Sequence, residues 1–119
     1  MEKGCTVTTI RTASETILEE VGSWPGVEVD DGELGELAFK FGPRELGHLH
    51  GDTAAHFSFP KSVWAGLEQQ GRIGYHPVFP DKQGPAARRI EDDADVRDVI
   101  ELLRINYDRV VARFGSAGR

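Results

Sequence analysis

Residues 44–59 read RELGHLHGDTAAHFSF, and this stretch decides the fold that the sequence predicts. Within it, 44–50 and 54–59 each have the length and the mixture of apolar and polar residues that are typical of half-buried strands. The Gly-Asp-Thr segment at 51–53 separates them and favours a tight turn. We therefore expect two antiparallel strands here, each with one face turned towards a core.

Strand geometry distributes these side chains between two faces, because residues two apart point the same way. On the first strand, one face is expected to carry Arg44, Leu46, His48 and His50. Glu45 falls on the opposite face, so we do not expect it to pair with Arg44. On the second strand the apolar side chains take one face and His56 takes the other. Helices on one side of a sheet turn its apolar face inwards, so His56 is expected to share the open face with the first two histidines.

Periodicity along the rest of the chain predicts three helices and four more strands. Thr12 and Glu15 have the spacing of a capping box at the start of the first helix, and Pro60 suits the first turn of the second. A stripe with a period of about 3.6 residues marks the third helix, which is capped by Asp92 or Asp93. The expected helices span 13–21, 60–71 and 93–114, and the further strands span 27–29, 37–41, 73–79 and 86–90.

These elements predict an α+β fold in a single domain, 1–119. The expected architecture is one antiparallel sheet with helices packed on one face, in the order α-β-β-β-β-α-β-β-α. The ordered core is expected over 12–114, followed by a flexible tail over 115–119. The sequence contains no internal repeat that would indicate a second unit.

The composition is that of an ordinary soluble protein, with 39% hydrophobic and 29% charged residues. The net charge of −6 argues against a general nucleic-acid binder, because phosphate affinity needs a concentrated basic surface. Cys5 is the only cysteine, which excludes an internal disulfide and fits a reducing compartment; we expect it to be a bystander thiol. No window approaches the roughly 18 apolar residues of a membrane span. A cytoplasmic protein is therefore expected.

The histidines of the open face support two interpretations. In the first, His48, His50 and His56 converge as an acid–base or metal site, since a His-x-His pair on one strand face has the separation that first-row metal ions accept. Asp52 would then lie nearby. In the second, the histidines are surface or hydrogen-bonding residues, and Gly51-Asp52 is simply a turn. Gly47 removes a side chain and lets another element approach the backbone closely.

The leading prediction is a polar site for a small anionic or carbonyl-bearing ligand, with a histidine acting as acid or base near neutral pH. Catalysis is assigned to His48, His50 and Asp52. Ligand binding is assigned to Arg44, His56 and His76, the last reaching the site from an edge strand. No metal is assigned, and the cofactor is left open.

Two alternatives stay open beside this prediction. One is a metal-dependent enzyme that uses the same histidines. The other is a non-enzymatic interaction or DNA-binding module, which the acidic charge disfavours. A homodimer, in which a second copy of the chain covers the open sheet face, is also left open.

Several motifs together resemble the small bacterial and fungal family known as the luciferase domain. They are WPGV at 24–27, RELGHLHGD at 44–52, FP at 59–60, HPVFPD at 76–81, LLR at 102–104 and Tyr107. The second of these is the most specific, and the resemblance covers 17–109. It implies a small domain with no assigned reaction, and not the flavin-dependent bacterial luciferase barrel, whose architecture needs about twice this length.

The chain departs from the family's pattern at two positions. The resemblance implies a Trp after the Gly of the late loop, where this chain has Gly84-Pro85, and an Asp where it has His56. The second departure makes His56 the least expected member of a three-histidine site. The order of elements also resembles the YjbR/MmcQ-like fold, which implies a possible role in DNA binding.

Overall fold

The computed structural model of the chain describes residues 11–32 and 35–115. In these residues the helices are α1 (Ala13–Gly22), α2 (Lys61–Gln69) and α3 (Asp93–Val110), and a short π-helical segment, η2 (Val111–Gly115), extends the last one. The strands are β2 (Val27–Asp31), β3 (Leu37–Phe41), β4 (Arg44–His50), β5 (Ala54–Ser58), β6 (Gly74–Tyr75) and β7 (Pro85–Arg89). The α+β prediction and the order of its elements are confirmed. Cys5 and the predicted tail beyond 115 lie outside the described residues.

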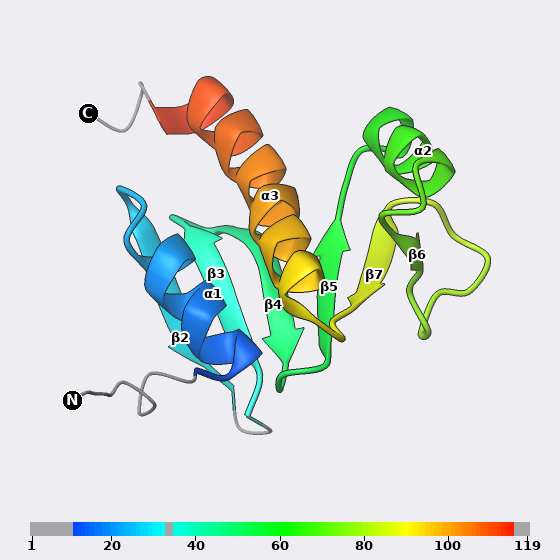
Figure 1. The fold of residues 1–119 in the computed structure, drawn as a ribbon. Coiled ribbons are helices and arrows are strands. Elements are labelled where there is room, and N and C mark those ends of the chain that lie inside the picture. Colours follow the sequence, from blue (N-terminus) through cyan, green and yellow to red (C-terminus); the bar gives the residue numbers. More distant parts are fainter. Residues whose placement is uncertain (1–10, 33–34, 116–119) are drawn as a thin grey trace.

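The described strands form one six-stranded antiparallel sheet in the order β2-β3-β4-β5-β7-β6 (Figure 1). β2 to β5 are a meander, and the chain then passes through α2 before β6 and β7 complete the sheet. β6 is much shorter than the strand predicted over 73–79. The physical reason is Pro77, which has no N–H for a strand ladder. The chain turns there and leaves an isolated bridge between His76 and Phe79.

α1 and α3 lie over one face of the sheet, while α2 lies beside the edge formed by β6 (Figure 1). The predicted capping box is present in α1: the Glu15 N–H donates to the Thr12 hydroxyl, and the Thr12 N–H donates to the Glu15 carboxylate. The indole N–H of Trp64 in α2 donates to the Pro85 carbonyl, 3.0 Å away. Within residues 11–32 and 35–115, none of the helices combines the length and the apolar character that crossing a bilayer requires.

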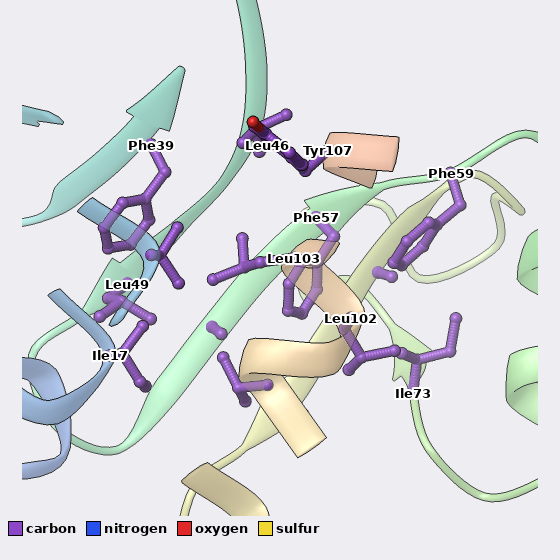
Figure 2. Packing of buried hydrophobic residues seen from close by; sticks show 14 of the residues in the cluster. Ile17, Phe39, Leu46, Leu49, Phe57, Phe59, Ile73, Leu102, Leu103 and Tyr107 are labelled. Carbon is purple, nitrogen blue, oxygen red and sulfur yellow. The ribbon is translucent and has the colours of Figure 1, made fainter. Parts of the chain in front are cut away.

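One hydrophobic core fills the space between the helices and the sheet (Figure 2). Phe39, Leu49 and Phe57 enter it from three neighbouring strands. They meet Ile17 from α1 and Leu103 from α3, and all five side chains are buried. The predicted inward faces of these strands are therefore correct at these positions.

A β-bulge interrupts the ladder between β3 and β4. Phe39 lies opposite Gly47, but Lys40 lies opposite Glu45, so Leu46 is an extra residue on β4. Its side chain is fully buried, although simple alternation places it on the open face. A bulge of one residue inverts the alternation beyond it, because the side-chain period of a strand is two.

The bulge reverses the two faces predicted for Arg44 and Glu45. Glu45 lies on the open face, where its carboxylate contacts His48. Arg44 lies on the helix face, with its guanidinium carbon 4.3 Å from the centre of the Phe114 ring in η2. The prediction that Arg44 stands beside the histidines is therefore wrong.

Asn106 in α3 holds the bulge in place. Among the described residues, Asn106 is the polar residue that is buried in the core, with 2% of its surface exposed. Its Nδ2 donates to the Leu46 carbonyl at 3.0 Å and to the Ser58 carbonyl at 3.1 Å. The β4–β5 register begins at the pair His48 and His56, just past these carbonyls. The Asn106 amide thus satisfies strand carbonyls where direct pairing between the two strands has ended.

Gly47 lies where α3 packs closely against the bulge. A Cβ at this position would lie 2.7 Å from Leu103 Cδ2 and 2.9 Å from Phe57 Cδ2. Both distances are shorter than van der Waals contact, so the prediction of a close approach at Gly47 is confirmed.

Replacing Gly47 by alanine should therefore destabilise the fold. We predict that Gly47→Ala lowers the free energy of unfolding by about 1–3 kcal/mol, because extra volume in a packed core forces its neighbours to shift. Gly66→Ala in α2 is the matched control, since a Cβ there meets nothing within 4 Å; it should be neutral or stabilising by up to about 1 kcal/mol. Urea unfolding of both variants measures the difference, and equal stability of the two would contradict the close packing.

Candidate functional site

All four histidines of the chain gather at the face of the sheet opposite α1 and α3. Their ring centres form a continuous series: His48 to His50 is 4.8 Å, His50 to His56 is 4.4 Å, and His56 to His76 is 4.1 Å. His48 and His56 are also 5.4 Å apart. We call these four residues the histidine cluster.

Strand register explains three members of the histidine cluster. His48 of β4 lies directly opposite His56 of β5, so their side chains share a face. His50 lies two residues along β4 and points the same way. His76 arrives differently, from the turn after β6, where its Nδ1 accepts a hydrogen bond from the Val78 N–H at 3.1 Å. The predicted co-facing of the first three histidines is confirmed, and His76 does lie beside them.

Three members of the histidine cluster have the geometry of a metal site. His48, His50 and His56 each offer a ring nitrogen, and these nitrogens all lie within 4.8 Å of one another. The Nε2 atoms of His48 and His50 are 3.1 Å apart. Two nitrogen ligands of one tetrahedral zinc ion lie about 3.3 Å apart, given Zn–N bonds of about 2.0–2.1 Å. The pair is therefore already close to the spacing that a single ion requires.

His56 is the electrostatic centre of the histidine cluster. Burial first, and then the neighbouring His76, His50 and His48, together lower the pKa of His56 from 6.5 to about 4. Burial also lowers the pKa of His76. The Nδ1 of His56 is buried without a hydrogen-bond partner among the described residues. A neutral imidazole with an unpaired nitrogen is the state in which histidine binds a metal ion.

Glu45 orients His48. The Nδ1–H of His48 donates to the Glu45 carboxylate at 2.7 Å, and this bond is the main cause that lowers the pKa of Glu45. With Nδ1 occupied, Nε2 is left to face His50. A carboxylate behind a histidine in this way is the usual outer-shell support of a metal ligand. Reasoning from simple alternation missed Glu45; the available signal was Gly47, since a glycine inside a strand often marks a bulge.

Asp52 does not join the histidine cluster through its carboxylate. Its Oδ1 accepts a hydrogen bond from the backbone N–H of Ser14, 2.9 Å away at the start of α1. Hydrogen bonding to Ser14, through its side chain first and its backbone second, lowers the pKa of Asp52. The prediction that Asp52 shares the histidine site is therefore wrong in its geometry. The turn that carries Asp52 leads towards the helix layer, where the side chain ties the hairpin to α1.

A cavity of about 960 Å³ lies between α1 and α3, with Asp52 on its rim. Seven of its fifteen lining residues are acidic, and its apolar lining includes Val96 and Ile100. The histidine cluster lies on the other face of the sheet and does not line this cavity. We place the candidate site at the histidines, because they bring several ligand atoms together on a geometry that the strand register imposes.

The low pKa of His56 predicts a loss of stability in acid. Unfolded His56 takes up a proton below about pH 6.5, whereas the folded residue does so only near its lowered pKa of about 4. The folded state therefore loses stability as the pH falls from about 6.5 to about 4. With a chelator present, the wild-type protein should lose more stability over this window than His56→Gln, which cannot titrate there. Urea unfolding at both ends of the window measures this, and equal losses would contradict the assignment.

Comparisons with known proteins agree with the resemblance noted in the sequence. A family model described as the Luciferase domain matches residues 43–106. No curated protein and no solved structure matches the chain. The matched segment contains the whole histidine cluster, Glu45 and Asn106, so the site and the bulge both fall inside it. Since the match covers more than half of the 119 residues, the chain belongs to the Luciferase domain family.

Proposed function

We propose that this protein is a metal-dependent enzyme in which His48, His50 and His56 hold a divalent first-row transition ion such as zinc. The observation that carries the proposal is the convergence of three ring nitrogens within 4.8 Å of one another. Imidazole nitrogens suit zinc, copper, iron and nickel, whereas magnesium and calcium prefer oxygen ligands. The ligand type therefore favours a transition metal.

Two further features support the proposal. The lowered pKa of His56 keeps its ring neutral at neutral pH, so a metal ion need not displace a proton from it. The hydrogen bond from His48 to Glu45 orients the imidazole, as outer-shell carboxylates do behind metal ligands. Without an ion, the buried Nδ1 of His56 has no partner among the described residues, a state that costs free energy.

Three protein ligands are typical of catalytic rather than structural zinc sites, because they leave a coordination position for water or substrate. A bound ion would polarise a carbonyl or lower the pKa of a bound water to about 7. His76 lies beside His56 and not among the three ligand residues, so it lines the approach to the ion. The substrate is then a small molecule with an oxygen atom that can reach the ion from the open face of the sheet.

Metal binding can be measured directly on untagged protein. We expect one Zn²⁺ or Co²⁺ per chain by calorimetric titration, and His50→Ala and His56→Ala should each weaken binding by more than about 100-fold, beyond the cost of an outer-shell change. His76→Ala is the control and should bind the ion nearly as the wild type does. At about 100 times the dissociation constant, the ion should stabilise the wild-type fold by about 2.7 kcal/mol.

Absence of stoichiometric binding would overturn the metal site. The same histidines would then form a metal-free acid–base site for a small polar ligand. Binding of that ligand would still depend on His48 and His50, but it would not change when a chelator is added.

Glu45 provides a second test that leaves all three ligands in place. Glu45→Gln should weaken metal binding by about 10–100-fold, because a neutral amide supports a metal ligand less well than an outer-shell carboxylate does. Glu28→Gln is the matched control, since Glu28 is an exposed carboxylate on the edge strand β2, two strands away from β4. Equal affinities of the two variants would show that Glu45 does not act on the site.

A further inference from the structure

Exposed apolar side chains are concentrated beside the histidine cluster. In the described residues the large hydrophobic side chains with the greatest exposure are Leu18, Tyr75, Val78 and Phe79. Tyr75 lies on the opposite face of the sheet from the histidines, because it pairs with the buried Ala86 and its ring contacts Trp64 of α2. Val78 and Phe79 are adjacent in the turn after β6, next to His76. Val78 is 69% exposed and Phe79 is 45% exposed. Exposed apolar residues that gather in one place mark a binding surface more often than scattered ones do.

The turn that carries these side chains has a defined structure. The Phe79 N–H donates to the His76 carbonyl at 2.9 Å, and the Val78 N–H donates to the His76 ring at 3.1 Å. The Lys82 ammonium lies 5.6 Å from the centre of the Phe79 ring and covers part of it. This turn places the Phe79 ring next to the His76 ring, with 5.5 Å between the two ring centres.

The two strands next to His56 on this side of the sheet carry small side chains at the positions in register with it. Across the strands, His56 of β5 faces Ala87 of β7, which faces Gly74 of β6. A Cβ at Gly74 would meet nothing within 4 Å. Ala87 and Gly74 therefore form a low strip on the open face, which leads from His56 to the sheet edge where β6 and its turn lie (Figure 1). Charged residues, among them Arg72 and Arg89, line the hollow that these two small residues share.

We propose that this strip and the Val78–Phe79 turn bind the hydrocarbon tail of a ligand whose acidic head group coordinates the ion; the proposal rests on the metal site proposed above. The ligand class is thus an aliphatic or aromatic acid, with a tail that extends past the width of the His76 ring to reach Phe79. A small ligand fits better than a protein partner, because the two exposed side chains of Val78 and Phe79 offer far less than the roughly 800 Å² per partner that a stable interface buries.

Hydroxamic acids that differ only in tail length test the proposal on the Co²⁺-loaded protein, with the visible absorption of the ion as the readout. In the wild type, octanohydroxamate should bind at least about tenfold more tightly than acetohydroxamate, since each buried methylene adds affinity. The double variant Val78→Ser/Phe79→Ser should lose this preference and bind both compounds within about twofold of each other. Its affinity for acetohydroxamate should equal that of the wild type, because the head group does not reach the turn.

Leu18→Ser is the matched control, since Leu18 is an equally apolar, exposed residue on α1; it should keep the full preference for the long tail. Equal binding of the two compounds to the wild type, or a preference that survives in the double variant, would overturn the tail site while the metal site stands. Failure of the protein to take up Co²⁺ would overturn the metal site and the tail site together. Light scattering adds one more outcome: a wild-type dimer that the double variant disrupts would assign the turn to a second copy of the chain and overturn the proposal.

Discussion

The hydrogen bonds from the Asn106 amide to two strand carbonyls are the constraint on which the rest of the structure depends. One carbonyl belongs to Leu46, the extra residue of the bulge, and the other to Ser58 at the end of β5. The buried amide lets β4 and β5 separate without leaving these acceptors unsatisfied, which would cost about 1–3 kcal/mol each. Arg109 in turn donates to the Asn106 oxygen at 2.7 Å, so every polar end of the side chain is used. α3 therefore sets the shape of β4 as well as covering the core.

The bulge connects the core to the candidate site across the thickness of one sheet. On the helix side, the missing side chain of Gly47 lets Leu103 pack against the backbone. On the open side, the inverted alternation presents Glu45 to His48. The same irregularity thus improves packing on one face and orients His48 on the other. The metal site that we propose would have its ligands on rigid strands, which is what a precise coordination geometry needs.

Much of the fold could be predicted from the sequence, because the signals involved are local. The capping box at Thr12, the strand at 44–50 and the turn after it depend on residues close together in the chain, and the structure has all three. The co-facing of His48, His50 and His56 also followed from strand alternation, since the register of β4 and β5 is regular from His48 onwards. His56, the residue least expected from the family resemblance, lies at the centre of the cluster.

By itself the sequence determined the α+β class, the order of the elements and the strand that carries the candidate site. The reason is that the hydrophobic period and the capping residues of each element depend only on residues within that segment. Only the tertiary structure decided which side of β4 Arg44 and Glu45 occupy, since the bulge is held by Asn106, 60 residues further along the chain. It also decided that Asp52 contacts α1 and that His76 joins the other histidines from a turn rather than a strand. The physical reason is the same in each case. A strand's alternation can be read locally, but the contacts that shift it by one residue come from elements distant in the chain.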